Sequence, residues 1–158
     1  MRELPRENVL DFPRPAVCEP CPHLLEIAFG GRTIASTCDG WRVLETYHPP
    51  TYYLPREAFD EGVLIANGRR SLCEWKGQAG YFDIAAGGRT AGSAAWSYER
   101  PTPPFAPIKG MVAVYAEPMD ACRVAGVDVV AQPGNFYGGW VTPNITGPVK
   151  GAPGTTHW

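Results

Sequence analysis

The middle of the chain gathers the side chains best suited to bind or transform a small molecule. Carboxylates, a thiol, a lysine amine and large aromatic rings fall between residues 45 and 98. Ligand pockets typically combine aromatic walls with a few convergent polar groups, and this mixture of residue types fits that pattern. The members of the cluster are Glu45, Tyr52, Tyr53, Cys73, Glu74, Lys76, Tyr81, Trp96 and Tyr98.

Three residues of this cluster are candidates for catalysis. Lys76 could hold an anionic group, or act as a nucleophile if its pKa were depressed. Glu45 could orient Lys76 or move a proton, and Cys73 could act as a thiol nucleophile. The candidate ligand-binding residues are Arg42, His48, Tyr53, Tyr81, Trp96 and Tyr98.

Purely structural roles could also account for these candidates. Glu45 could pair with a cation across a sheet, and Cys73 could be a small buried hydrophobe. Trp96 and Tyr98 alternate on one strand face and could be core residues. His48 precedes two prolines, where its imidazole could bond to the backbone instead of serving as a general acid or base. The density of the cluster, more than any single residue, indicates a site.

The known motifs for phosphate, metal and hydrolase chemistry are missing from the sequence. It contains no G-x-x-x-x-G-K-[ST], G-x-G-x-x-G, H-E-x-x-H or G-x-S-x-G pattern. Cys18 and Cys21 form one CxxC that could supply half of a zinc site, but a structural site needs four ligands and no second pair follows. We therefore predict no metal site and leave the cofactor unknown.

The composition excludes several classes of protein. The 158 residues are 44% hydrophobic, which is enough for a packed core, and the 18 glycines and 17 prolines disfavour a helical bundle. A formal net charge of −2 gives no electrostatic footprint for nucleic acid or an anionic membrane. No apolar run approaches the roughly 18 residues of a membrane span. With no apolar leader and an odd count of five cysteines, we expect a cytoplasmic protein with reduced thiols.

Alternation of apolar residues and turn signals predict a mainly β fold. We expect turns at 30–31 and 39–40, a last hairpin about Gly126, and one short helix from Pro55 through Phe59. The strands are expected at residues 24–29, 33–37, 41–47, 71–75, 79–84, 90–99, 108–117 and 122–131.

Two segments fall outside this strand pattern. Residues 1–22 hold five prolines, so we expect an extended arm. Residues 129–158 are rich in glycine and proline yet keep four large rings, so we expect this C-terminal tail to pack on the domain; a partly ordered terminus is the alternative. Between them, residues 23–128 are predicted to form a single antiparallel β domain of two sheets. Residues 63–66 fit either the end of the short helix or the start of a strand.

The order of several motifs resembles a known family. The motifs are GGxxIA (30–35), RVLETxHPPTYYxP (42–55), CEWKGxAxY (73–81), AWxYxxP (95–101) and IxGxVAxY (108–115). Together, over about residues 24–122, they resemble the domain-of-unknown-function 427 family, which carries a nucleotidyltransferase-like label. The ending, FYGGW (136–140) with GPxKG (147–151), resembles a bacterial subgroup with the same tail.

This resemblance implies a β-tent architecture, shared with methionine sulfoxide reductase B and the thalidomide-binding domain of cereblon. Relatives with that fold often hold zinc through paired CxxC motifs, whereas this chain has one CxxC, before its first predicted strand. The family label implies a nucleotide as the ligand.

Two functional hypotheses of different classes follow. The first is a pocket for a small nucleotide-like or anionic molecule, and the residues leave open whether the protein is an enzyme. The second is a non-enzymatic protein-interaction or ligand-sensing module. Thiol redox chemistry, from the five cysteines and the β-tent link, is a third alternative. We expect a monomer or weak homodimer.

Overall fold

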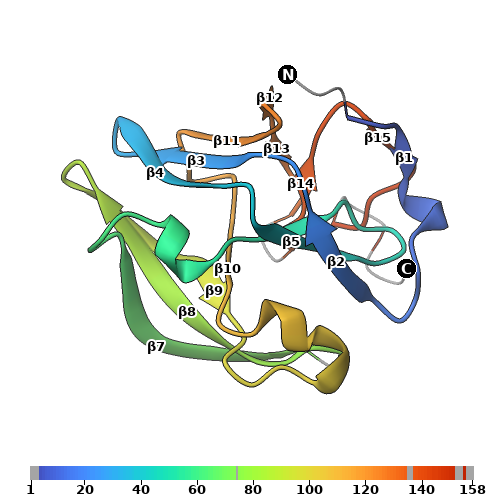
Figure 1. Ribbon diagram of the computed structural model, residues 1–158, viewed down its shortest axis with the longest axis horizontal. Coiled ribbons are helices and arrows are strands. Elements are labelled where there is room, and N and C mark those ends of the chain that lie inside the picture. Colours follow the sequence, from blue (N-terminus) through green and yellow to red (C-terminus); the bar gives the residue numbers. More distant parts are fainter. Residues whose placement is uncertain (1–3, 74, 135–136, 152–154, 156–158) are drawn as a thin grey trace.

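The computed structural model describes residues 4–73, 75–134, 137–151 and 155. Within them the chain forms short and long β-strands joined by tight turns and by three 3₁₀ helices (Figure 1). These helices are η1 (Val9–Asp11), η2 (Arg56–Ala58) and η3 (Pro103–Ile108).

Two antiparallel sheets of four strands form the body of the molecule. The first contains, in spatial order, β10 (Val112–Val114), β9 (Arg89–Ser97), β8 (Gly77–Ala86) and β7 (Leu64–Cys73). The second contains β12 (Val127–Asp128), β11 (Ala121–Val124), β3 (Leu25–Phe29) and β4 (Arg32–Thr37). Figure 1 shows the long strands β7 and β8 curving beneath the layer of β3, β4 and β11.

Three smaller sheets include strands from the terminal segments. A three-stranded antiparallel sheet contains β2 (Val17–Cys21), β5 (Gly40–Leu44) and β6 (Thr51–Tyr53). In the C-terminal tail β13 (Val130–Ala131) pairs antiparallel with β14 (Trp140–Val141). β1 (Glu7–Asn8) pairs parallel with β15 (Ile145–Thr146), so the N-terminal arm and the tail lie side by side.

The buried side chains fall mainly into two groups. One apolar group, which includes Leu25, Ile27 and Ile84, fills the space between the two four-stranded sheets. The second group is rich in aromatic residues, among them Tyr53 and Trp96, and lies where β6 meets β8, β9 and η3. This second group forms the base of the candidate site.

The predicted mainly β, antiparallel fold with short helical structure is confirmed. The helix expected at Pro55 is the short η2, and the chain at 63–66 starts β7. Hydrogen bonding divides the strands among five sheets, where we expected two. The described residues contain no helix long and apolar enough to cross a membrane.

The hairpin expected at residues 39–40 is wrong. β4 pairs with β3, whereas β5 pairs with β2 and β6, so the chain passes from one sheet to another at this point. The glycine is needed for packing instead, because a Cβ at Gly40 would collide with the Leu25 side chain and come within 3.1 Å of the Tyr53 carbonyl oxygen. A dipeptide typical of turns here marks a close crossing of two sheets.

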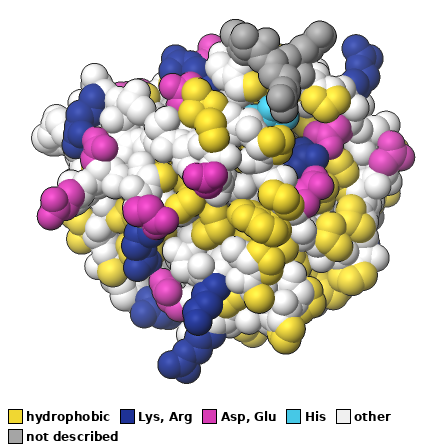
Figure 2. Space-filling model, viewed as in Figure 1, with side chains coloured by type: hydrophobic (Ala, Val, Ile, Leu, Met, Phe, Trp, Pro, Cys, Tyr) yellow, Lys and Arg dark blue, Asp and Glu magenta, His cyan; other side chains and the backbone are white. Residues whose placement is uncertain are grey.

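The face of the molecule seen in Figure 2 carries a band of hydrophobic side chains with charged groups around it. Part of this band lies over η3, whose Pro103, Pro104 and Pro107 are exposed. Scattered exposed apolar groups are normal for a folded protein.

Candidate functional site

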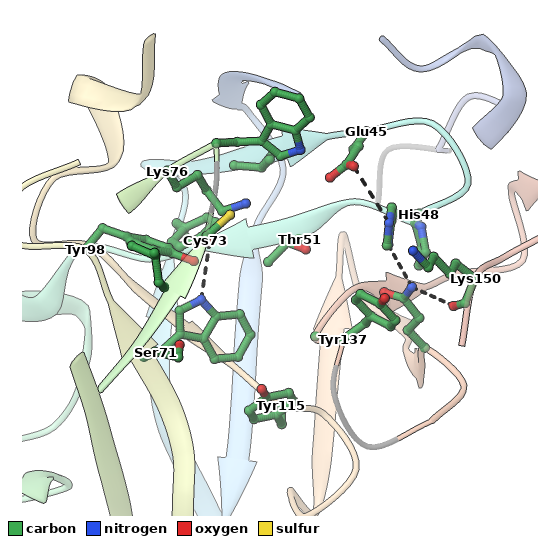
Figure 3. Close-up of a pocket in the computed structure, with 18 of the residues that line it drawn as sticks. Glu45, His48, Thr51, Ser71, Cys73, Lys76, Tyr98, Tyr115, Tyr137 and Lys150 are labelled. Carbon is green, nitrogen blue, oxygen red and sulfur yellow. Dashed lines mark hydrogen bonds and ion pairs between the residues drawn. The ribbon is translucent and has the colours of Figure 1, made fainter. Parts of the chain in front are cut away.

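A cavity of about 330 Å³ opens between the β6 strand, the ends of β7–β9 and the C-terminal tail. Figure 3 shows Cys73, Lys76 and Tyr98 on one side of it, and His48, Tyr137 and Lys150 on the other. The cavity is lined by Val43, Glu45, His48, Pro49, Thr51, Tyr53, Ser71, Leu72, Cys73, Trp75, Lys76, Tyr81, Trp96, Tyr98, Tyr115, Gln132, Tyr137, Gly138 and Lys150.

Aromatic rings form the inner wall of the cavity. Trp96 lies opposite Tyr81 in the β8–β9 ladder, and Trp96 and Tyr98 are two residues apart, so the strand period places these rings on one face. The Trp96 indole N–H donates to the Tyr53 hydroxyl at 3.4 Å. The ring centroids of Trp96 and Tyr115 are 4.6 Å apart. The wall is therefore a connected ring cluster with hydroxyl groups at its surface.

Burial keeps these hydroxyls protonated. Desolvation raises the pKa of Tyr53 and Tyr98 well above the usual value, and raises that of Tyr115 to about 12. A neutral phenol can donate a hydrogen bond as well as accept one. The Ser71 hydroxyl lies 2.8 Å from that of Tyr81, which adds another polar pair at the entrance.

The turn between β7 and β8 holds two candidate catalytic groups. Cys73 pairs with Gly77 at the end of the ladder, and Gly77 has a φ of 108°, which only glycine adopts readily. Thr102 stabilises this turn, because its backbone N–H donates to the Lys76 carbonyl at 3.0 Å. The Lys76 ammonium lies 5.8 Å from the centroid of the Tyr98 ring, within cation–π range.

A second charged group faces the cavity from the opposite side. The Glu45 carboxylate lies 4.0 Å from His48 Nε2 and 3.8 Å from the guanidinium of Arg14. The ring of His48 meets that of Tyr137 edge-on, with centroids 4.9 Å apart. The Lys150 ammonium lies 5.6 Å from the centroid of the same Tyr137 ring.

His48 is held in its neutral form. Burial lowers its pKa, and the positive charges of Lys150, Arg14 and Lys76 lower it further, against the opposing effect of Glu45. His48 therefore brings no positive charge to the cavity at neutral pH.

The tail side of the cavity is anchored by Trp140. This residue is 1% exposed, and its indole N–H donates to the carbonyl of Val114 at 2.9 Å. Its backbone N–H donates to Pro50 O at 2.8 Å. Two residues earlier the backbone of Gly138 lies directly on Trp96, where a Cβ would collide with the indole. The tail is thus a fitted wall of the cavity.

Most of the predicted site residues meet at this cavity. Those that line it are Glu45, His48, Tyr53, Cys73, Lys76, Tyr81, Trp96 and Tyr98. Arg42 does not, because it lies on the opposite face of β5 from Val43, which lines the cavity. Its guanidinium is turned to the arm, where it donates to both carboxylate oxygens of Glu7 at 2.8 Å and to Glu19 at 2.9 Å.

Other residues of the predicted cluster and tail have separate places. Tyr52 is buried against Trp140, with centroids 5.3 Å apart. Glu74 and two of the four tail rings, Phe136 and Trp158, lie outside the described residues.

The cysteines of the CxxC motif lie away from the cavity. The Cys18 thiol is 3.5 Å from the Pro104 carbonyl, and the buried Cys21 thiol is 3.9 Å from the His23 carbonyl. Within the described ranges no three His, Cys, Asp or Glu side chains are grouped as metal ligands.

Several lining residues were not among the sequence candidates. Lys150 carries the tail's cation and could have been considered for that reason, whereas Gln132 offers no signal of its own in the sequence. Both reach the cavity through the fold of the tail. The lining residues that were not among the sequence candidates are Val43, Pro49, Thr51, Ser71, Leu72, Trp75, Tyr115, Gln132, Tyr137, Gly138 and Lys150.

The comparison with known proteins matches the middle of the chain and leaves out the C-terminal tail. A family model described as "Domain of unknown function (DUF427)" matches residues 17–125. No curated protein matches the chain significantly. The matched segment runs from β2 through β11, so it supplies the aromatic wall and both four-stranded sheets except β12. Since the match spans more than half of its length, the chain belongs to the DUF427 family.

Proposed function

We propose that the cavity binds a small anionic molecule that carries a planar ring. The observation that carries this proposal is the placement of Lys76 and Lys150 on opposite sides of a cavity whose inner wall is aromatic (Figure 3). Planar rings stack on aromatic side chains, and ammonium groups attract phosphate or carboxylate oxygens. A mononucleotide is one compound of this class.

The charges of the cavity favour an anion. Lys76 and Lys150 outnumber Glu45, whose carboxylate also lies near Arg14. The neutral state of His48 adds no charge of either sign. The hydroxyls of Tyr98 and Tyr115 stay protonated, so they add no negative charge that would repel an anion.

The volume also fits this class. A cavity of about 330 Å³ lies at the lower end of the range for small-molecule sites, roughly 300–1,000 Å³. It therefore suits a compound of one or two rings.

Cys73, Lys76 and Glu45 are the groups that could support a reaction on such a ligand. Cys73 lies close enough to Tyr98 to help raise the pKa of its hydroxyl, after the larger effect of burial, so the thiol belongs to the aromatic side of the cavity. Glu45 faces Arg14 and His48, so it is better placed to move a proton on the tail side of the cavity. We propose binding as the primary activity and these three groups as the candidates for any chemistry.

Fluorescence titration with paired probes tests the proposal. The paired probes are phenyl phosphate with phenol, and adenosine monophosphate with adenosine. We expect the charged member of a pair to quench tryptophan fluorescence at a lower concentration than its neutral partner. Lys76→Ala and Lys150→Ala should each weaken binding by roughly tenfold or more, because a hydrogen bond to a charged group contributes about 1.5–3 kcal/mol.

The chain supplies its own control for this titration. Lys109, the third lysine, is exposed and lies outside the cavity, so Lys109→Ala should bind like the wild type. Equal binding by all three lysine variants, or no preference for the charged probes, would refute the proposal.

A second candidate function, a protein-interaction module, is favoured by the exposed edge strand β7. This strand ends its sheet, and its Leu72 and Ile65 are 82% and 48% exposed. Unpaired edges can add a strand from another chain, although the charges of Arg69 and Arg70 on this edge oppose such pairing. Sedimentation velocity of the wild type and of Leu72→Lys tests it: weak self-association that Leu72→Lys abolishes would support the interface, and a monomer in both would exclude it.

A further inference from the structure

The side chain of Gln132 lies buried behind the cavity and forms three polar contacts. Gln132 is 3% exposed. Its Oε1 accepts from the Gly139 backbone N–H at 3.0 Å, and its Nε2 donates to the Lys150 carbonyl at 2.8 Å. The same Nε2 lies 3.0 Å from His48 Nδ1.

The two backbone partners determine how this amide is oriented. A backbone N–H can only donate and a carbonyl can only accept. If the amide of Gln132 were rotated by half a turn, its NH₂ would face the N–H of Gly139 and its oxygen would face the carbonyl of Lys150. Both contacts would be repulsive, so the orientation with Nε2 toward His48 is the one that satisfies every group.

This orientation assigns the proton on the histidine. One hydrogen of the Gln132 NH₂ goes to Lys150, and the other points at His48 Nδ1, which must therefore accept it with a lone pair. We infer that Gln132 is a positioning residue that holds His48 as the neutral Nε2–H tautomer, so that His48 offers a bound ligand a hydrogen-bond donor. Nδ1 is then occupied and cannot serve as a general base.

The groups around His48 agree with this assignment. Glu45 lies after β5, Lys76 in the β7–β8 turn, Arg14 in the N-terminal arm and Lys150 in the tail, and these are the charges that act on His48. The 4.0 Å between Glu45 and Nε2 is longer than a hydrogen bond. The Nε2–H can therefore donate to an acceptor oxygen on a ligand in the cavity.

The tail thus controls the chemistry of a residue in the family domain. His48 lies within the matched residues 17–125, whereas Gln132 and its partner Gly139 lie beyond them. A Cβ at Gly139 would come within 2.6 Å of Gln132 Oε1 and of the Pro49 ring, so the glycine allows the backbone to approach the amide. The role of His48 as a ligand donor rests on the proposed function, but its tautomer does not.

Long-range ¹H–¹⁵N correlation spectra of the histidine rings test the inference directly. The chain has three histidines, and His48→Asn identifies the signals of His48. At pH 7 we expect a wild-type spectrum with Nε2 protonated and Nδ1 unprotonated. A spectrum with Nδ1 protonated, or with the charged ring, would overturn the inference whether or not the Gln132 variants fold.

Two substitutions of Gln132 and one control extend the test. In Gln132→Glu the carboxylate can only accept a hydrogen bond, which favours a proton on Nδ1, so we expect Nδ1 to become protonated and the pKa of His48 to rise. In Gln132→Met the donor is lost, and both tautomers should appear. Gln78, the other glutamine of the chain, is exposed, and Gln78→Met should leave the spectrum unchanged. Folded Gln132 variants with the wild-type tautomer would contradict the role of this residue.

The ligand role has its own readout. When phenyl phosphate binds, the Nε2–H signal should shift downfield, as expected for a new hydrogen bond. Binding without that shift would refute the donor role of His48 but leave the proposed function intact. Absence of binding would refute the proposed function and, with it, the donor role, while the tautomer measured in the unliganded protein would stand.

Discussion

Replacement of Trp140 tests whether the tail is anchored as a wall of the cavity. Full burial of a tryptophan removes about 150–250 Å² from water, which at about 25 cal/mol/Å² corresponds to roughly 4–6 kcal/mol. Large-to-small replacements of buried aromatic residues cost about 3–5 kcal/mol. Because Trp140 is 1% exposed and also donates to Val114, we expect Trp140→Ala to lower the free energy of unfolding by about 4 kcal/mol.

Trp140→Phe separates the hydrogen bond from the packing. The phenyl ring keeps most of the apolar contact with Tyr52 but cannot donate to the Val114 carbonyl, which leaves that buried oxygen without this donor. Such a loss costs about 1–3 kcal/mol, so the phenylalanine variant should fall between the alanine variant and the wild type.

Urea denaturation followed by circular dichroism measures both effects, with Val130→Ala as the control. Val130 lies in the same tail but is 68% exposed, and its truncation should change stability by less than about 0.5 kcal/mol. A decrease of under about 1 kcal/mol in the free energy of unfolding of Trp140→Ala would refute the anchoring of the tail, because truncation of a fully buried tryptophan costs about 3–5 kcal/mol.

Two further predictions concern the cavity itself. Gly138→Ala places a methyl group against the Trp96 indole, so this overpacking should lower the free energy of unfolding by about 1–3 kcal/mol and change tryptophan fluorescence. In the control Gly92→Ala the methyl group meets only Asp83 Oδ1, at 3.9 Å, and should change neither the stability nor the fluorescence. Equal effects of the two variants would contradict the close contact between Gly138 and Trp96. The pKa of His48 is lower in the folded protein than in the unfolded chain, so the unfolded chain is protonated first as the pH falls. The stability that neutral His48 contributes is therefore fully present above about pH 6.5, the unfolded pKa, and is lost as the pH falls through the folded pKa. The urea midpoint of the wild type should therefore fall more steeply than that of His48→Asn below pH 6.5; parallel curves would argue against a depressed pKa.

The aromatic wall could be predicted because it depends on local periodicity. Trp96 lies in β9 and Tyr98 directly follows the last residue of that strand, Ser97, so the strand period places the two rings together. Their partner Tyr81 follows from the register of β8 against β9, which the turns approximate. The positions of side chains on regular strands could thus be predicted from the sequence.

The charged part of the site was harder to predict, because it depends on where regular structure ends. β5 stops at Leu44, and Tyr47 adopts a φ of 70°, so the strand expected for 41–47 ends before Glu45 and His48, the two residues that reach the cavity. Arg42 turns to Glu7 in the arm, while Glu45 reaches the cavity.

The contacts made by the tail could not be predicted from the sequence, for another reason. Gln132 meets His48 across 84 positions of sequence, and nothing local in either residue specifies that pairing. Gly40 shows the same limit, since its need for close packing against Leu25 mimics a turn signal.

Native mass spectrometry of the protein purified from its own cells tests whether the cavity holds a ligand. We expect a bound small molecule that remains on the wild type and on Lys109→Ala but is lost from Lys76→Ala and from Lys150→Ala. The released compound should be an anion with a planar ring. An unliganded wild-type protein, or a compound retained equally by all three lysine variants, would contradict a ligand site between Lys76 and Lys150.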